Sequence, residues 1–600
     1  MAKREQQSFL HGAIILVGST LLVKFIGAIF KIPLGNLIGG VGMGYFSAAY
    51  DLYLPLYALA MGGLPIAVSR MVAERVAEKR YRDVRKVLRI AQRAFLITGI
   101  SGFVIMLLLA YPYILYTGTS GALPGILCIT PCLLFCCIMS SYRGYYEGLR
   151  NMYPTAISSL IEALGKLVLG LGFAYLVILK ARAEYAASGT VFGKAITIVL
   201  DPEKTIEECT NEAIADGAAN YAAAAAILGI TIGAALGAIF LIIRHKVVGD
   251  KITVSELRAA PRPQRNRQVF RIMLAISIPV VLGSLVTNVA SLIDLATVQR
   301  RLVDAYNSSP GTITAMYEGL LPASVQGLTG KELAQEISVY LYGCYKGFAY
   351  SLYNLVPTLT SVLGVSALPV LTTAWTKRDK RGVKVNIESM VRTTALISLP
   401  AGIGLSALAG GILHLLYSSK PEEATVATPM LVILGAAAVF AGLMAPLTNM
   451  LQAIGKQNIP VRNIAIGAVL KIVVNFVLVG IPSINVVGAP VGTLCCYFYI
   501  FISNFICLLK YSHVRISILR TLLKPAFAGI LCGAAAWASS GLLGWIIPSS
   551  KIVTILAICI AGIVYVIALL CTRAITREDL AMLPKGQKIA AVLAKRGWIR

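Results

Sequence analysis

Long apolar runs recur from one end of this 600-residue chain to the other, and they limit its fold more than any other feature. A helix needs about 20 consecutive apolar residues to cross the hydrocarbon core of a bilayer. Runs of this length occur near 9–34, 45–69, 92–115, 121–142, 155–179, 221–243, 270–295, 338–373, 392–417, 429–452, 462–481, 486–509, 523–546 and 551–572. They predict an all-α polytopic membrane protein with about 14 transmembrane helices, because helices satisfy their own backbone hydrogen bonds in lipid.

The composition agrees with this prediction. The chain is 57% hydrophobic and only 14% charged, whereas a soluble globular domain is about 25% charged. These values exclude an ordinary soluble enzyme and a disordered or fibrous chain. The net charge of +27 has the sign of a nucleic-acid-binding protein, but the surface of such a protein is not this apolar. We therefore expect no nucleic-acid partner.

The basic residues predict how the helices are oriented. They gather in the connections 70–89, 244–267 and 377–384 and in the tail 573–600, all on the same predicted side of the membrane. Acidic residues gather on the other side, in 184–216 and at 422–423. Because cytoplasmic loops carry the Lys/Arg excess, we expect both termini in the cytoplasm. The two long outer connections, 180–220 and 296–337, exceed usual loop lengths and are expected to be partly structured.

Two short motifs occur once in each half of the chain. Gly63–Ser69 resembles Ser366–Thr372, and Glu147–Pro154 resembles Gln452–Pro460. Because the copies lie six predicted spans apart, they indicate parallel repeats and a two-lobed alternating-access transporter. The predicted domains are an N-terminal lobe (1–243), a basic linker (244–269), a C-terminal lobe (270–509), a final helix pair (510–572) and a basic tail (573–600).

Ionisable residues inside the predicted spans are the candidate functional residues, because such groups are costly in lipid. The basic members are Lys24, Lys31, Lys166, Lys346 and Lys471, with Asn475 on the same helix face as Lys471. The acidic members are Asp51, Glu162 and Asp294, and Arg143 lies at a helix end near Glu147. Two alternatives stay open: Lys31 and Lys346 could snorkel to an interface, and Glu162 and Lys166 could neutralise each other as an (i, i+4) pair.

Several other patterns point to packing rather than chemistry. The twelve cysteines lie mostly in apolar runs and are expected to pack as small apolar residues. Gly229, Gly233 and Gly237 form a small-residue ridge typical of close helix packing, and the glycines at 40, 42 and 44 are expected to form a turn. No P-loop, zinc-protease or nucleophile-elbow motif occurs. We therefore expect a transporter, not an enzyme, without a metal or cofactor.

The sequence resembles the polysaccharide-exporter branch of the multidrug/oligosaccharidyl-lipid/polysaccharide (MOP) superfamily, in particular the stage V sporulation protein B group, relatives of the lipid II flippase MurJ. The resembling segments are 24–33, 62–70, 145–154, 293–295, 300–302 and 452–460, together with Lys471 and Asn475. One departure occurs in the second span, where MurJ-type members often carry arginines and this chain has Tyr53 and Tyr57.

The resemblance implies export of a lipid-linked oligosaccharide across a bacterial plasma membrane. Lys24 and Lys31 would contact the diphosphate, and the last two helices would form a groove for the polyprenyl tail. Membrane lipids are implied partners, and cell-wall synthesis proteins could bind the outer loops. Asp51, Arg143, Glu162 and Asp294 are candidates for coupling or gating. The alternatives are a multidrug or organic-cation antiporter of the same superfamily, and a scaffold or membrane enzyme of envelope assembly.

Overall fold

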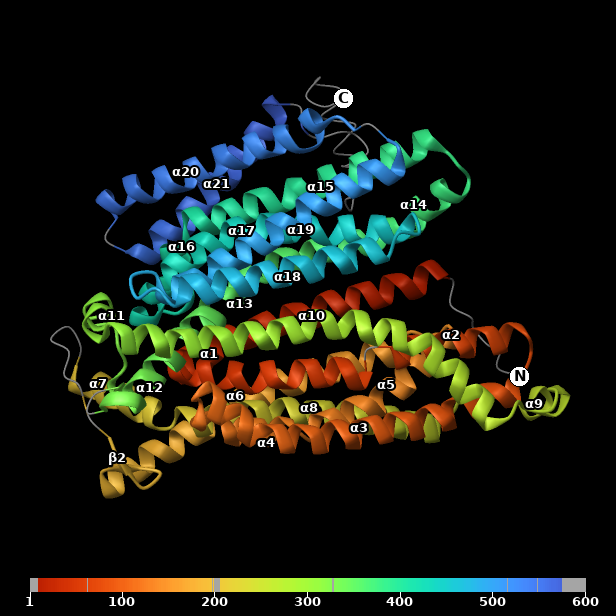
Figure 1. Cartoon of the computed structure of the whole chain (residues 1–600), viewed down its shortest axis with the longest axis horizontal. Coiled ribbons are helices and arrows are strands. Elements are labelled where there is room, and N and C mark those ends of the chain that lie inside the picture. Colours follow the sequence, from red (N-terminus) through yellow and green to blue (C-terminus); the bar gives the residue numbers. More distant parts are fainter. Residues whose placement is uncertain are drawn as a thin grey trace. The chain divides into compact units, whose positions relative to one another are not determined.

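The computed structural model describes residues 9–61, 63–196, 198, 205–325, 328–514, 516–547, 549–572 and 574. Helices dominate the described chain, which confirms the all-α prediction (Figure 1). Eleven helical segments of the described residues are long and apolar enough to cross a membrane. The predicted number of fourteen is not confirmed. Two neighbouring helices form one continuous candidate, Gly18–Ala77, and the predicted spans 270–295 and 338–373 are not among the candidates.

The chain divides into two compact units: unit 1 comprises 1–303 and 321–343, and unit 2 comprises 304–320 and 344–600. Unit 1 contains α1 (Phe9–Met61), α2 (Leu64–Ala77), α3 (Tyr81–Thr117), η1 (Ser120–Ala122), α4 (Leu123–Ile129), α5 (Cys132–Gly148), α6 (Tyr153–Ser188), β1 (Thr190–Val191), β2 (Lys194–Ala195), α7 (Ile206–Gly217), α8 (Ala219–Val247), α9 (Val254–Ala259), most of α10 (Asn266–Ser308), η2 (Ala323–Val325) and α12 (Gly330–Gly343).

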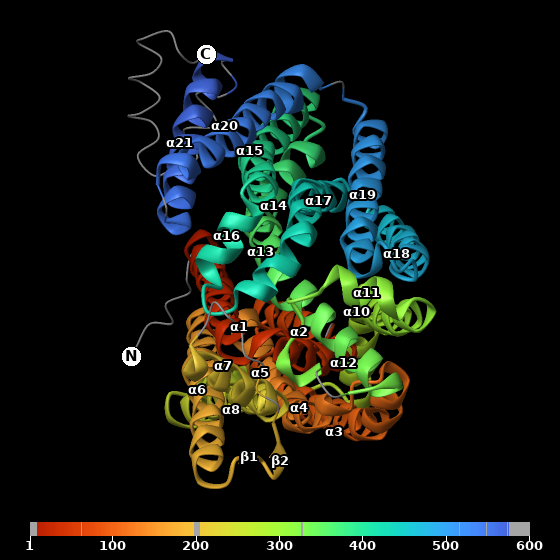
Figure 2. The same ribbon diagram turned by 90° about the vertical axis from the view of Figure 1, so that its left-hand side faces the viewer.

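Unit 2 contains the end of α10 and α11 (Pro310–Met316), η3 (Cys344–Ala349), α13 (Tyr350–Tyr353), α14 (Leu355–Thr376), α15 (Lys380–Ala407), α16 (Ala409–Leu416), α17 (Pro421–Ala453), α18 (Asn458–Val479), η4 (Asn485–Val487), α19 (Gly488–Ser512), η5 (Leu519–Leu523), α20 (Lys524–Ile546) and α21 (Ser550–Cys571). The segments η3 and η5 are π-helical turns. Figure 2 shows α18 beside α19 and α20 beside α21.

The outer connections predicted to be partly structured do contain secondary structure. The segment 180–220 holds the antiparallel pair β1 and β2 and the helix α7, which begins with a capping box formed by Thr205 and Glu208. The segment 296–337 holds α11, η2 and the start of α12. This prediction is therefore confirmed.

The glycine-rich stretch at 40–44 does not form the predicted turn. The chain is helical there and bends at Gly39, whose φ is 63°. The glycines instead bring α1 against α12: a Cβ on Gly343 would lie 1.8 Å from the backbone oxygen of Gly40, and one on Gly44 would lie 2.3 Å from that of Val339. The absence of side chains at these positions permits a close helix crossing, as small residues do between membrane helices.

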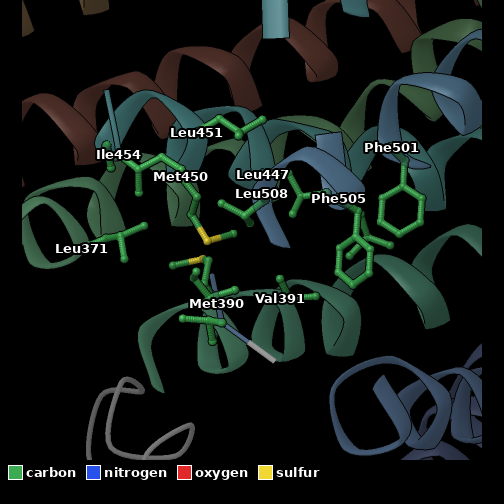
Figure 3. Close-up of a cluster of buried hydrophobic side chains, with 14 of the residues drawn as sticks. Leu371, Met390, Val391, Leu447, Met450, Leu451, Ile454, Phe501, Phe505 and Leu508 are labelled. Carbon is green, nitrogen blue, oxygen red and sulfur yellow. The ribbon is translucent and has the colours of Figure 1, made fainter. Parts of the chain in front are cut away.

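The core of unit 2 is an apolar cluster contributed by helices far apart in the sequence. It joins Leu371 of α14, Val391 of α15, Leu447 and Leu451 of α17 and Leu508 of α19, with methionine and phenylalanine side chains between them (Figure 3). Leu451 and Leu508 are fully buried. Lipid is as apolar as these side chains, so the cluster is stabilised by van der Waals packing instead of removal from water, and it holds α14, α15, α17 and α19 together.

Candidate functional site

A close crossing of α6 and α8 positions the first group of candidate residues in unit 1. A Cβ on Gly233 of α8 would lie 2.8 Å from the backbone oxygen of Glu162 and 3.0 Å from the backbone nitrogen of Lys166, and one on Gly229 would lie 2.3 Å from the nitrogen of Gly170. The predicted packing role of this glycine ridge is therefore confirmed. The crossing fixes the backbone of the turn that carries Glu162 and Lys166.

Lys166 lies against aromatic rings of α1. Its Nζ is 4.9 Å from the ring centroid of Phe30 and 5.7 Å from that of Tyr50. Lys31 is close enough to repel Lys166 electrostatically, and Glu162 is close enough to attract it. An ammonium within about 6 Å of an aromatic ring is stabilised by the ring's quadrupole, and more so when water is excluded. We call Phe30, Lys31, Tyr50, Glu162 and Lys166 the Lys166 site.

Glu162 forms its ion pair with Arg143 of α5, not with Lys166. The Arg143 Nη2 donates to Glu162 Oε2 over 2.9 Å, and the Arg143 Nε donates to Ser158 Oγ over 2.9 Å. The two charged side chains are 18% and 33% exposed, respectively. Within the described part of the chain Lys166 forms no salt bridge, so the (i, i+4) neutralisation considered from the sequence is not the pairing that the structure contains.

A row of tyrosines in α1 extends the Lys166 site. Successive ring centroids are 5.8 Å apart between Tyr50 and Tyr53 and 5.4 Å apart between Tyr53 and Tyr57. The Tyr53 hydroxyl lies 3.5 Å from Cys132 Sγ and 3.6 Å from Cys136 Sγ. Sequence analysis did not select this row, although spacings of three and four residues place its members on one helix face.

Asp51, the residue after Tyr50 in α1, contacts a different helix, α12. Its Oδ2 accepts a hydrogen bond of 2.9 Å from the hydroxyl of Tyr342, in α12 of the same unit. Asp51 also contributes to the electrostatic field at Tyr50. This carboxylate therefore joins α12 to the helix that carries the tyrosine row.

Unit 2 contains a second lysine among aromatic rings. Lys346 lies in the π-helical segment η3, and the residue is 9% exposed. Its Nζ is 4.7 Å from the ring centroid of Tyr350 and 6.0 Å from that of Tyr345. The Tyr345 hydroxyl lies 3.2 Å from Thr493 Oγ1 of α19. The Lys346 ammonium is thus held among aromatic rings of its own segment. π-Helical turns occur frequently at functional sites.

Tyrosines connect Lys346 with the candidate residues of α18. The ring centroids of Tyr350 and Tyr353 are 5.0 Å apart, and those of Tyr353 and Tyr497 are 6.1 Å apart. Lys471 contributes to the electrostatic field at Tyr497. We call Tyr345, Lys346, Tyr350, Tyr353, Lys471 and Tyr497 the Lys346 site. Tyr345 and Tyr497 of this site were not selected from the sequence.

Asn475 lies one helical turn from Lys471 and is fully buried. A Cβ on Gly492 of α19 would lie 1.9 Å from the Asn475 Oδ1. The missing side chain at Gly492 therefore makes room for the Asn475 carboxamide between α18 and α19.

The remaining candidates are placed as follows. Lys24 is exposed on α1, whereas Lys31 is half-buried. Asp294 lies in α10, but its side chain is outside the described part of the structure. All twelve cysteines are free thiols. Among the described residues, no group of three or more His, Cys, Asp or Glu side chains converges on a point that could hold a metal ion.

Comparison with known proteins identifies two matching families. A family described as polysaccharide biosynthesis protein matches residues 9–200, and a family described as lipid II flippase MurJ matches residues 348–566. The lipid II flippase MurJ of Bacillus subtilis (strain 168) is 22% identical over 574 residues, covering 93% of this chain and 94% of that protein. Stage V sporulation protein B of the same organism is 22% identical over 605 residues, covering 96% of this chain and 98% of that protein.

Solved structures with a similar fold include a lipid II flippase and a MATE transporter. A solved structure of lipid II flippase MurJ in an inward closed conformation aligns with a TM-score of 0.59 at 13% identity, covering 92% of this chain and 98% of that one. An inward-facing multidrug resistance MATE family transporter of the MOP superfamily aligns with a TM-score of 0.53 at 14% identity. These relatives are a flippase and a transporter, in agreement with the expectation of a transporter. The chain is therefore a multi-pass membrane protein related to lipid II flippase MurJ and to stage V sporulation protein B, with the fold of the MOP superfamily.

Proposed function

We propose that this protein is an alternating-access flippase that exports a polyprenyl diphosphate-linked oligosaccharide, a cell-wall precursor such as lipid II, across a bacterial plasma membrane. The observation that carries the proposal is the pair of lysine sites on membrane helices, in a chain related over nearly its whole length to a lipid II flippase. An ammonium held in a membrane protein is costly unless it meets an anion, a carbonyl or an aromatic ring. A diphosphate supplies the anion.

Each lysine site, taken by itself, would suit a phosphate group of the substrate headgroup. Lys31 and Lys166 in unit 1, and Lys346 and Lys471 in unit 2, would bind phosphate oxygens, with Asn475 donating a hydrogen bond. Lys24, exposed on the same helix as Lys31, would make the first contact with the anion. Because lysine acts as a point charge instead of a two-pronged fork, such sites would accept headgroups of differing geometry.

The carboxylates would serve coupling or gating. Glu162 is already paired with Arg143, so a proton or cation that neutralises Glu162 would release Arg143. Asp51 holds Tyr342 and would transmit a change at α1 to α12. Asp294 of α10 is proposed for the same role from its place in the sequence. Both termini are proposed to lie in the cytoplasm, and the outer segments 180–220 and 296–337 to contact cell-wall synthesis proteins.

Unit 2 contains a surface that would suit the lipid tail of the substrate. A cavity of about 530 Å³ lies between η5, α20 and the end of α21. Its lining is mostly apolar, with Leu519, Leu523, Phe527 and Ile530, and with Lys524 at its edge. The Lys524 Nζ donates to the Thr572 backbone oxygen over 2.6 Å, which ties the two helices together. This groove supports the proposed binding of a polyprenyl chain.

The test is translocation by the full-length protein in proteoliposomes, measured with fluorescent lipid II and with a second polyprenyl diphosphate sugar. We expect translocation by the unmodified protein and its loss in Lys166→Met. The matched control is Lys180→Met, which removes an exposed lysine of the same helix. Failure to move any polyprenyl diphosphate lipid would overturn the proposal, and efflux of an organic cation in the same vesicles would favour an antiporter.

A further inference from the structure

Unit 1 contains a polar cavity at the end of its helices that carries the β1–β2 pair. Figure 1 shows α7, α12 and β2 together at this end, and α9 at the opposite end of the unit. The cavity measures about 520 Å³ and lies between η1, β2, α7, the starts of α8 and α12, and Tyr45 of α1. Ligand pockets in proteins typically measure about 300–1,000 Å³. The charge pattern of the sequence predicts that this end faces outward.

The lining of this cavity, which we call the end pocket, is rich in hydrogen-bond acceptors. It includes the carboxylates of Asp216, Glu332 and Glu336 but a single lysine, Lys194. The amides of Asn220 and Gln335 add one acceptor and two donors each. A ligand that fits this lining therefore has to bring several hydrogen-bond donors and, given the excess of carboxylates, a positive charge.

Two lining groups indicate that the pocket is built for a polar occupant. The Tyr45 hydroxyl donates to Glu336 Oε2 over 2.9 Å and holds that carboxylate in one orientation. The Ser324 hydroxyl, also in the lining, is shielded from solvent and makes no hydrogen bond to any residue of the described structure. A shielded hydroxyl without a partner costs about 1–3 kcal/mol, and a rotation of the Ser324 side chain toward the pocket would let a bound polar ligand remove this cost.

Glycines keep the pocket walls close together. Gly118 has a φ of 72°, and a Cβ there would lie 2.8 Å from Gln335 Nε2. A Cβ on Gly121 would lie 2.4 Å from the ring of Tyr45. Larger residues at either position would displace a lining side chain, so the shape of the pocket depends on these two glycines.

We propose that the end pocket binds an amino-bearing saccharide of about two rings, with its hydroxyls donating to Glu332 and Glu336 and its ammonium placed among the three carboxylates. Charge-assisted hydrogen bonds of this kind are about twice as strong as neutral ones. The saccharide is either the headgroup of a lipid-linked sugar or a soluble glycan. The inference goes beyond the transport proposed above, because binding at this pocket is measurable without translocation.

The experiment measures binding to the full-length protein in nanodiscs by calorimetry. The soluble probe is the β-1,4-linked disaccharide of glucosamine, and binding is measured in mildly acidic buffer, in which its amines are protonated. Cellobiose, which has the same ring linkage and no amine, is the matched ligand. The lipid arm uses a polyprenyl diphosphate lipid that carries the same disaccharide. Binding of the soluble probe identifies the soluble source, and binding of the lipid alone identifies the headgroup source, provided that the pocket variants weaken it.

We expect Glu332→Gln to weaken binding by about tenfold or more. Asn220→Ala is a second variant that keeps the charge and is expected to weaken binding severalfold. The matched control is Glu207→Gln, which makes the same charge change on an exposed residue of α7 outside the pocket lining. The proposal is overturned if neither form of the disaccharide binds, if cellobiose binds equally well, or if Glu207→Gln weakens binding as much as Glu332→Gln.

Discussion

The Lys166 site of unit 1 and the Lys346 site of unit 2 each place a lysine among aromatic rings, but they differ in their charged partners. Each places a lysine ammonium within 4.7–4.9 Å of one aromatic ring centroid and within 5.7–6.0 Å of another. The Lys166 site also contains Glu162, which is bound to Arg143. The Lys346 site continues through the stacked rings of Tyr350, Tyr353 and Tyr497 toward Lys471. The shared lysine among aromatic rings is what the proposed anion binding requires of each site. The carboxylate of Glu162 occurs only in the Lys166 site, where a proton or cation would neutralise it.

The largest expected effect comes from removing the lysines themselves. Lys166→Met and Lys346→Met should each lower the rate of lipid translocation by about 10- to 100-fold, because under the proposed function each would remove a charge-assisted contact to the diphosphate. Methionine retains the apolar stem, so packing changes little. Rates in proteoliposomes at matched protein density provide the measurement. Recovery in Lys166→Arg and Lys346→Arg would establish that charge is the cause. A normal rate in either methionine variant would show that the lysine of that site does not contribute to translocation.

The second prediction tests the charged partners of unit 1. Arg143→Met should reduce translocation more than the double variant Arg143→Met with Glu162→Gln, because the single change leaves a partly buried carboxylate without its cation. Unpairing a fully buried charge costs about 3–5 kcal/mol, and partial exposure of this pair reduces that to about 1–2 kcal/mol. Translocation rates and thermal unfolding of the four proteins form a double-mutant cycle. Additive effects would show that the pair has no coupling of its own.

Much of the fold followed from local pattern in the sequence. The apolar runs predicted the helices because backbone groups in lipid must bond within their own segment. The ridge of Gly229, Gly233 and Gly237 predicted a close helix crossing, which the α6–α8 packing contains. The glycines at 40–44 were interpreted wrongly as a turn. Glycine permits both a turn and a close crossing, and only the tertiary partner, Gly343 of α12, distinguishes them.

The candidate sites were predictable as residue types but not as contacts. A lysine in an apolar run is visible in the sequence, so Lys166 and Lys346 were selected. The rings near Lys166 come from another helix, as Phe30 of α1 does, and this contact is not visible in the sequence. The rings near Lys346, those of Tyr345 and Tyr350, lie within four residues of it in the sequence. The pairing of Glu162 with Arg143 rather than Lys166 depends on how α5 and α6 cross. Helix spacing indicated only the pairing of Glu162 with Lys166, and the pairing with Arg143 follows from three-dimensional packing.

The third prediction compares glycines at the helix crossings of the two units. Gly492→Ala in unit 2 should displace the Asn475 carboxamide, whose Oδ1 would lie 1.9 Å from the new Cβ. Gly233→Ala in unit 1 should separate α6 from α8 at the backbone itself. Overpacking costs about 1–3 kcal/mol, and we expect the larger loss in Gly233→Ala because backbone yields less than a side chain. Thermal unfolding in detergent measures both losses. Equal stability of the two variants would contradict the predicted order.

The smallest expected effect concerns the connections that the sequence predicts to be cytoplasmic. In unit 1, Asp250 follows α8 and binds Arg85 of α3: its Oδ2 accepts from the Arg85 Nε over 2.7 Å, and its Oδ1 accepts from the Arg85 Nη2 over 3.0 Å. The Tyr145 hydroxyl and the Ile252 backbone N–H also donate to this carboxylate. The corresponding feature of unit 2 is a short turn, in which Asp379 accepts from the Gly382 backbone N–H and starts α15.

Acid should therefore loosen the connection of unit 1. Burial opposes ionisation of Asp250, but the hydrogen bonds from Arg85, Ile252 and Tyr145 outweigh it and lower the pKa of the carboxyl below its ordinary value of 3.8. A carboxyl with a lowered pKa in the folded state adds stability above its unfolded pKa and loses it as the pH falls through the folded value. Near neutral pH, the midpoint temperature of thermal unfolding should be higher for the unmodified protein than for Asp250→Asn. The expected increase corresponds to about 1–2 kcal/mol of folding stability. The difference should be constant above about pH 5, begin to fall near pH 3.8, and disappear only when the pH drops below the lowered pKa of Asp250 in the folded protein. Because the other carboxyls titrate equally in both proteins, a difference that shows no decrease between pH 5 and the lowest pH at which the protein stays folded would show that Asp250 acts through its shape, not its charge.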